Sequence, residues 1–140
     1  MTSLEMLYDT AMKNGIYIES FSLPLCTSLS TKCGKDYYIG IDKSKLCTSS
    51  EEAVIIAHEI GHCATDSFYR ENEDSSRRKK CERLADEWAI KNLLPPDKFL
   101  SAYDHGCREP WEFAEELSVT VSFAQKAMEY YKDRILLRQR

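Results

Sequence analysis

The spacing of apolar residues at the start of the chain predicts one helix followed by a small sheet. Apolar positions recur at helical spacing over residues 3–13, and Gly15 is suited to ending that helix. Residues 16–21 and 37–42 are short runs rich in β-branched and aromatic side chains, which predict two strands. The connection between them favours an antiparallel pair, with room for a third short strand within residues 25–31. Such a sheet edge can hold an extended peptide by strand addition.

A strongly apolar helix is expected in the middle of the chain, over about residues 50–65. Its start is signalled by Thr48 and Ser49, which are good helix caps, followed by acidic residues in the first turn. Residues 66–80 are almost entirely polar or charged and end in the basic run Arg-Arg-Lys-Lys. This composition favours an exposed loop, although a basic patch that steers an acidic substrate is the alternative.

The remainder of the chain is predicted to be helical. A helix begins at Cys81, carries an apolar face and is closed by two prolines. A short helix over residues 97–104, another after Pro110 and a final amphipathic helix over residues 123–137 follow. No repeat, low-complexity segment or linker divides the sequence. We therefore expect one α+β domain over residues 1–140, mainly helical, with a small antiparallel β-sheet over the middle helix.

The middle helix contains the motif His-Glu-Ile-Gly-His at residues 58–62. Residues four apart lie one turn above each other on a helix, so His58 and His62 can present two imidazoles to one point, at ~2.0–2.1 Å from a zinc ion. Glu59 is rotated by roughly 100° from His58 and can reach a metal-bound water, but it is poorly placed to be a ligand. Two buried core histidines are the alternative explanation. The apolar residues before the motif favour the metal site, because a zinc helix must be packed to hold its ligands.

A catalytic zinc site with two histidines needs a third protein ligand and keeps its fourth position for water. Glu82 is the best candidate, since it follows His62 by 20 residues and lies on the apolar face of the next predicted helix. Asp86 lies one turn further on and can accept the free N–H of a ligand imidazole. An exposed helix carboxylate is the alternative for Glu82. His105 is the other candidate ligand, although its Asp-His-Gly turn favours a surface position or a contact to the transition state.

Composition narrows the class of protein further. The chain has 140 residues, of which 43% are apolar and 30% are charged, and its net charge of −4 does not favour nucleic-acid binding. No apolar run is long enough to span a membrane, and the N-terminus lacks the features of a secretory signal. These features favour a cytoplasmic protein, in which the six cysteines are expected to be reduced thiols.

Three motifs together resemble those of the ImmA/IrrE family of zinc metallopeptidases. They are Ala-His-Glu-Ile-Gly-His at residues 57–62, Glu-x-x-Ala-Asp-x-Trp-Ala at 82–89 and Leu-Leu-Pro-Pro at 93–96. Residues 113–122 are similar to a further segment of the family, so that the resemblance covers about residues 37–131. The first motif is shared by many zinc peptidases, and the combination is much more specific.

The resemblance implies a zincin-like α+β fold of the gluzincin kind, with one zinc ion per chain bound by His58, His62 and Glu82, and with Glu59 as general base. It also implies a cytoplasmic protein of a bacterium, a phage or a mobile element. Such a protein would act in transcription regulation by cleaving a partner repressor or antitoxin of the helix-turn-helix (XRE) type. Leu84 departs from the family pattern, since many members carry a second acidic residue there, and this leaves Glu82 without a competing neighbour.

The expected reaction is hydrolysis of a peptide bond, with zinc activating a water whose proton Glu59 takes. The oxyanion also needs a donor, for which Tyr69, Tyr103 and His105 are the candidates. One alternative is a catalytically quiet metal-binding regulatory or interaction protein of the same fold. Another is a protease that stays inert until a signal or a partner opens its cleft. A structural zinc site is normally closed by four protein ligands and has no need of Glu59, which favours the enzyme.

Overall fold

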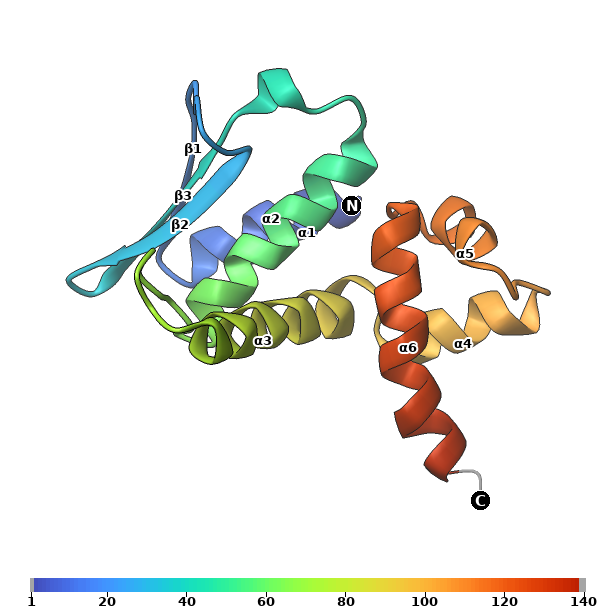
Figure 1. Ribbon diagram of the computed structural model, residues 1–140. Coiled ribbons are helices and arrows are strands. Elements are labelled where there is room, and N and C mark those ends of the chain that lie inside the picture. Colours follow the sequence, from blue (N-terminus) through green and yellow to red (C-terminus); the bar gives the residue numbers. More distant parts are fainter. Residues whose placement is uncertain (1, 139–140) are drawn as a thin grey trace. The chain divides into compact units, whose positions relative to one another are not determined.

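A computed structural model describes residues 2–138, with side chains for residues 2–134 (Figure 1). The described residues form six α-helices, three strands and one short 3-10 helix, so the expected α+β class is confirmed. In chain order the elements are α1 (Ser3–Lys13), β1 (Ile16–Ser20), β2 (Ser28–Cys33), β3 (Asp36–Ile41), η1 (Lys43–Lys45), α2 (Ser49–Ala64), α3 (Ser75–Leu93), α4 (Pro96–Asp104), α5 (Pro110–Leu117) and α6 (Val121–Arg138). The chain divides into two compact units, Met1–Ala89 and Ile90–Arg140. Compact units can belong to one domain, so the single domain stays a prediction.

The sheet of the first unit has the strand order β1-β3-β2 and is mixed. β1 pairs with β3 in parallel, whereas β2 pairs with β3 in antiparallel fashion. The expectation that residues 16–21 and 37–42 form an antiparallel pair is therefore wrong. The reason is β2, which reverses the chain between them and gives β1 and β3 the same direction. The third short strand was expected within residues 25–31 and is found at Ser28–Cys33.

A two-residue turn joins β2 to β3. Cys33 lies opposite Asp36 in the ladder, so Gly34 and Lys35 form the whole turn. Gly34 has a φ of +66°, a backbone conformation that two-residue hairpin turns require and that glycine adopts without strain. The turn pairs β2 with β3, and in the strand order β1-β3-β2 this leaves β2 as an edge strand of the sheet, next to α2.

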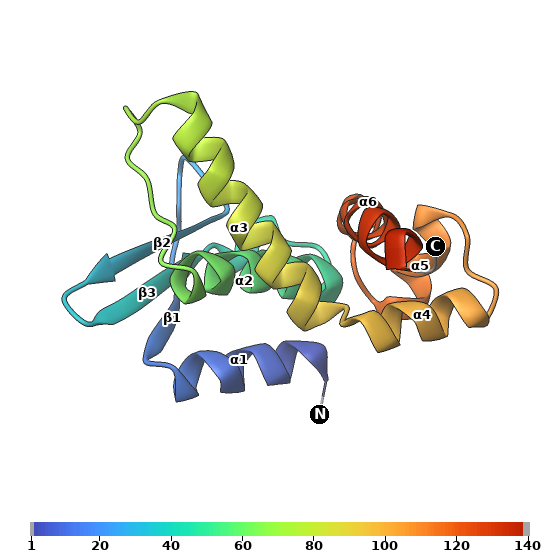
Figure 2. The ribbon, with the colours of Figure 1, turned by 90° about the horizontal axis from the view of Figure 1, so that it is seen from below.

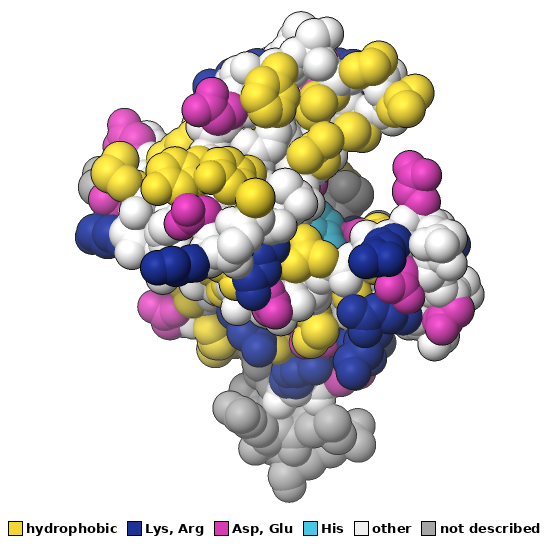
Figure 3. Space-filling view, turned by 90° about the vertical axis from the view of Figure 1, so that its left-hand side faces the viewer, with side chains coloured by type: hydrophobic (Ala, Val, Ile, Leu, Met, Phe, Trp, Pro, Cys, Tyr) yellow, Lys and Arg dark blue, Asp and Glu magenta, His cyan; other side chains and the backbone are white. Residues whose placement is uncertain are grey.

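The helices α1 and α2 cover one face of the sheet, as Figures 1 and 2 show. Four isoleucines of β3 and α2 are at most 1% exposed, namely Ile39, Ile41, Ile56 and Ile60. On the strands, Tyr17 and Tyr38 stay exposed and their rings stack 5.3 Å apart. Figure 3 looks onto the left-hand side of Figure 1 and shows hydrophobic side chains gathered there. The core of the first unit therefore lies between the sheet and α2.

Side-chain caps fix where the two long helices of the first unit begin. Thr48 accepts a hydrogen bond from the backbone N–H of Glu51 at 3.1 Å, which confirms the expected start of α2. The Asp74 carboxylate accepts from the backbone N–H of Arg77 at 2.8 Å, and α3 begins at Ser75. The expectation of a loop through residue 80 is therefore wrong, because this cap places the basic run on the first turns of α3.

The second unit is built around three aromatic rings. The ring centroid of Phe99 in α4 lies 4.7 Å from that of Phe113 in α5 and 5.0 Å from that of Tyr131 in α6. The hydroxyl of Tyr131 donates to the backbone oxygen of Leu94 at 2.5 Å. Ser118 ends α5 in the left-handed conformation, with a φ of 56°. The three helices expected for this part of the sequence are confirmed.

The structure also bears on the membrane and cysteine expectations. None of the helices among the described residues combines the length and the apolar composition that crossing a membrane requires. All six cysteines are free thiols, of which Cys63, Cys81 and Cys107 are buried.

Candidate metal centre

A close approach of α3 to α2 creates the site. A Cβ atom at Gly61 would lie 2.5 Å from the backbone oxygen of Ala85 and 3.0 Å from its Cα, so the two helices could not approach this closely with any larger residue at position 61. Ala85 itself is completely buried. Glu82 and Asp86 flank this contact on α3 and therefore face the histidines of α2.

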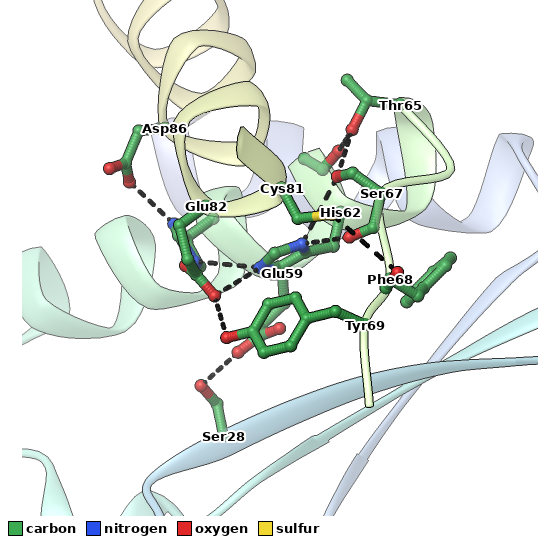
Figure 4. Close-up of polar contacts among 12 residues, drawn as sticks. Ser28, Glu59, His62, Thr65, Ser67, Phe68, Tyr69, Cys81, Glu82 and Asp86 are labelled. Atoms are coloured by element: carbon green, nitrogen blue, oxygen red, sulfur yellow. Dashed lines mark hydrogen bonds and ion pairs between the residues drawn. The ribbon is translucent and has the colours of Figure 1, made fainter. Parts of the chain in front are cut away.

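Three side chains, His58, His62 and Glu82, converge on one point, and Figure 4 shows His62 and Glu82 facing each other there. His58 Nε2 lies 3.2 Å from His62 Nε2 and 2.8 Å from Glu82 Oε2. His62 Nε2 lies 3.4 Å from Glu82 Oε1. One ligand atom from each of the three residues can be chosen so that all lie within 4.8 Å of one another. Figure 3 shows histidine surface inside a hollow of the molecule.

The other nitrogen of each imidazole is held by an acceptor. His58 Nδ1 lies 2.8 Å from Asp86 Oδ1, and His62 Nδ1 lies 2.6 Å from the backbone oxygen of Ser67. Because a carboxylate and a carbonyl only accept, each Nδ1 carries a proton, so Nε2 is the nitrogen of each ring whose lone pair a cation can take once that nitrogen is deprotonated. Asp86 thus makes the contact that the sequence led us to expect, and it fixes the orientation of His58.

The donor set fits a zinc ion. Two atoms that each lie ~2.0–2.1 Å from a tetrahedral zinc ion are about 3.3–3.4 Å apart. The Nε2 atoms of His58 and His62, at 3.2 Å, and the pair His62 Nε2 and Glu82 Oε1, at 3.4 Å, match this spacing. The third pair, His58 Nε2 and Glu82 Oε2, is at a hydrogen-bond distance of 2.8 Å. Two imidazole lone pairs and a carboxylate around one point form a set of ligands that a divalent cation prefers.

Glu59 lies beside the three-residue cluster and not in it. It is only 7% exposed, although it carries a carboxylate. Its Oε2 atom accepts a hydrogen bond of 2.6 Å from the hydroxyl of Ser28, on the edge strand β2. In Figure 4 the side chain points away from the imidazole of His62 toward that strand. The helical spacing thus places the Glu59 carboxylate close to the two histidines but outside the set of three candidate ligands.

The comparison with protein families decides the class of this site. Residues 16–129 match the peptidase family whose sequence model is described as an IrrE N-terminal-like domain. The chain belongs to this peptidase family. The match spans α2 and α3 entirely, and it confirms the resemblance inferred from the motifs. No curated protein and no solved structure matches the chain. The family consists of metallopeptidases, and this supports a peptide-bond hydrolase with a metal at His58, His62 and Glu82.

The carboxylates of this peptidase change the protonation of the histidines. Burial acts to lower the pKa of His58, but its hydrogen bonds with Asp86 and Glu82 outweigh that effect and raise the pKa to about 9. At His62, burial also acts to lower the pKa, but the hydrogen bonds with Glu82 and the Ser67 oxygen outweigh that effect and raise the pKa. The hydrogen bond with His58, followed by that with His62, holds the pKa of Glu82 well below its usual range. A proton therefore competes with a cation for this cluster.

Tyr69 is the expected oxyanion donor that lies in the same unit as the cluster. Its hydroxyl donates to Glu82 Oε1 at 2.5 Å, and its ring centroid lies 6.3 Å from that of His62. The hydrogen bond to Glu82, together with burial, raises the pKa of Tyr69 to about 12. In the second unit, Tyr103 stacks under the guanidinium of Arg108 and His105 Nδ1 lies 3.0 Å from Glu116 Oε1. The roles of Tyr103 and His105 stay predictions.

Two contacts of the site were missed in the sequence. Ser67 acts through its backbone oxygen, which any residue could provide, so no side-chain signal exists for it. A turn after α2 brings it back to His62, because Asp66 adopts a φ of 51° and the Ser67 N–H donates to the His62 oxygen at 2.9 Å. Ser28 lies 31 residues before Glu59 and could be found only once β2 was placed next to α2. Gly61 was a readable signal, since glycine inside a helix indicates a close approach.

Proposed function

We propose that this chain is a zinc-dependent endopeptidase. The observation that carries the proposal is the convergence of His58, His62 and Glu82 beside the buried carboxylate of Glu59. A structural zinc site normally has four protein ligands, whereas this cluster has three among the described residues. Three ligands leave a position for water, as a hydrolytic site requires. The peptidase family of the chain supports the same reaction class.

His58, His62 and Glu82 would hold the zinc ion, one per chain. When bound, zinc supplies a Lewis acid that polarises the substrate carbonyl and lowers the pKa of a water molecule toward ~7. Asp86 and the Ser67 oxygen keep the Nδ1 protons of the two imidazoles, so that both Nε2 lone pairs stay directed at the cluster.

Glu59 is proposed as the general base. Its carboxylate takes a proton from the attacking water as the water oxygen bonds to the peptide carbonyl carbon. The same carboxylate then delivers the proton to the amide nitrogen as the carbon–nitrogen bond breaks, so that an amine leaves. Glu59 serves both steps because it lies next to the ligands without binding to them.

Tyr69 is proposed as the donor to the oxyanion. Its hydroxyl already reaches the cluster through Glu82, at 2.5 Å. A phenol with a pKa of about 12 stays protonated at neutral pH and can donate a hydrogen bond as negative charge develops on the carbonyl oxygen.

The substrate that we propose is a partner repressor or antitoxin of the helix-turn-helix type, cleaved in the cytoplasm. This choice rests on the resemblance to the ImmA/IrrE family and on the sheet edge. β2 is an edge strand, and its residue Ser28 contacts Glu59. An extended segment that pairs with β2 would therefore pass beside the base. The proposal includes no direct contact with nucleic acid, in line with the net charge of −4.

The test uses, as candidate substrate, any repressor of the helix-turn-helix type that is encoded next to the gene of this chain. Purified, zinc-loaded protein is incubated with it, and the products are identified by mass spectrometry. We expect cleavage at one site by the wild type and none by Glu59→Gln, which should retain zinc. Zinc binding without any cleavage by the wild type would instead support the catalytically quiet metal-binding regulator.

A further inference from the structure

The contact between Ser28 and Glu59 joins the sheet to the base. The Ser28 hydroxyl donates to Glu59 Oε2 at 2.6 Å, and in Figure 4 it approaches the carboxylate from the strand below α2. This is a strong hydrogen bond, because the acceptor is a carboxylate and its residue, Glu59, is buried. It fixes one of the two oxygens of the proposed base.

The second oxygen of Glu59 stays available. Among the described residues no hydrogen bond to Oε1 is found, and no buried side-chain oxygen or nitrogen lacks a partner. Oε1 therefore reaches accessible space. A carboxylate with one oxygen held and the other open has a fixed plane, so the lone pair that takes the proton has a defined direction.

The strand that carries Ser28 is also the free edge of the sheet. Ser28 lies opposite Ile41 in the ladder with β3, at the first position of β2. The other side of β2 has no strand partner among the described residues. The position of Ser28, and with it the orientation of Glu59, thus depends on the strand along which we propose that the substrate lies.

We propose that Ser28 is a positioning residue of the peptidase reaction, which holds the Glu59 carboxylate in the orientation that proton transfer requires. The proposal rests on the proposed function. A positioning role and a purely structural role of Ser28 predict different kinetic effects. If Ser28 positions the base, its loss slows the chemical step and leaves substrate binding unchanged.

The kinetic test compares Ser28→Ala with Ser28→Thr, which keeps a hydroxyl, and with Ser101→Ala as a matched control. Ser101 lies on α4, away from the strand proposed to bind the substrate, is exposed and has no side-chain hydrogen bond among those found in the described residues. The substrate is a quenched fluorescent peptide that spans the cleavage site of the repressor. We expect Ser28→Ala to lower kcat by about tenfold, with KM changed by less than about twofold. Ser28→Thr should restore most of kcat, and Ser101→Ala should behave as the wild type.

A second measurement tests the hydrogen bond between Ser28 and Glu59 directly and does not depend on catalytic activity. Ser28→Ala is introduced into the wild type and into Glu59→Ala, and the four unfolding equilibria form a double-mutant cycle. We expect Ser28→Ala to lower the folding equilibrium constant about fivefold more in the wild-type background, because only there does the hydroxyl have its acceptor.

The outcomes separate the two proposals. Cleavage by the wild type with an unchanged kcat in Ser28→Ala overturns the positioning role alone. A kcat loss that Ser28→Thr does not restore, with no coupling in the cycle, overturns it as well. A wild type that cleaves neither repressor nor peptide overturns the proposed function, and the role of Ser28 with it.

Discussion

Gly61 on α2 and Ala85 on α3 are in backbone contact, and this contact sets the distance between the helix that carries both histidines and the helix that carries Glu82. A Cβ at position 61 would lie 2.5 Å from the Ala85 oxygen, and a backbone atom cannot move aside as a flexible side chain can. The geometry of the metal cluster therefore depends on a residue that touches no ligand.

Gly61→Ala should weaken both the fold and the metal site. The added methyl must push α3 away from α2, which costs about 1–3 kcal/mol of unfolding free energy. The same shift separates Glu82 from the histidines, so zinc content should fall. Urea unfolding and metal analysis measure the two effects. Ala64→Ser, at an exposed position of the same helix, is the control and should change neither. A fully loaded, equally stable Gly61→Ala protein would contradict the structural argument.

Removal of a ligand should remove the ion. We expect one zinc per chain in the wild type after purification, and a strong loss in both His58→Ala and Glu82→Ala. Zinc at one hundred times its dissociation constant stabilises a folded protein by about 2.7 kcal/mol, so a chelator should lower the Tm of the wild type and not that of the variants. Glu71→Ala, in the exposed loop before α3, is the matched acidic control. Zinc retained by Glu82→Ala would move the third ligand elsewhere, with His105 as the next candidate.

Zinc affinity should rise with pH between pH 6.5 and about 9. The pKa of His58 is raised from 6.5 to about 9 in the metal-free fold, so a proton occupies its ring over this range and zinc must displace it. By the same linkage, protonated His58 stabilises the metal-free fold fully below pH 6.5, and this contribution is lost as the pH rises to about 9.

Zinc titrations across this range, in buffers of different ionisation enthalpy, measure both the affinity and the proton released. Asp86→Asn removes the first of the two contacts that raise the pKa of His58, so the pH dependence should shift to lower pH. An affinity that stays constant from pH 6.5 to 9 would show that His58 is not protonated in the metal-free protein.

Tyr69→Phe should slow hydrolysis and leave zinc binding intact. Removal of one oxyanion donor typically lowers kcat by about 10²–10³-fold. Because the pKa of Tyr69 is about 12, its hydroxyl should stay a donor up to pH 10, and its ionisation should not limit activity there. Tyr103→Phe and His105→Ala are measured in parallel, since they remove the two other expected donors. A large kcat loss in one of these, with full activity in Tyr69→Phe, would reassign the role.

Much of the fold could be predicted from the sequence, because the sequence patterns that indicate its helices are local. The helix that carries His58 and His62 combines a Thr48 cap with an apolar run, and both act within a few residues of sequence. The sheet was harder, because strand direction is decided by which strands pair. Residues 28–33 are mostly small and polar, so their strand was only weakly indicated and its pairing was not predicted, and β1 and β3 were taken as an antiparallel pair. The turn at Gly34 was the signal that could have corrected this.

In the candidate site, too, the residues with local sequence signals were predicted, and the long-range contacts were not. His58, Glu59 and His62 follow from helical spacing, and Glu82 and Asp86 follow from the apolar face of the next helix. Their mutual distances do not, since these depend on how closely two helices pack. Ser67 and Ser28 were not predicted, because the first acts through a backbone atom and the second through a contact across 31 residues.

The placement of the three candidate ligands has a consequence for the chain as a polymer. His58 and His62 lie on α2, Glu82 lies on α3, and a mainly polar connection runs between them. An ion bound by all three would act as a cross-link that closes a ring of the chain between residues 62 and 82. Closing such a ring restricts the unfolded ensemble in the same way as a disulfide does. A chain whose six cysteines are all free would thereby gain a reversible cross-link, whose formation depends on the metal supply and not on redox conditions.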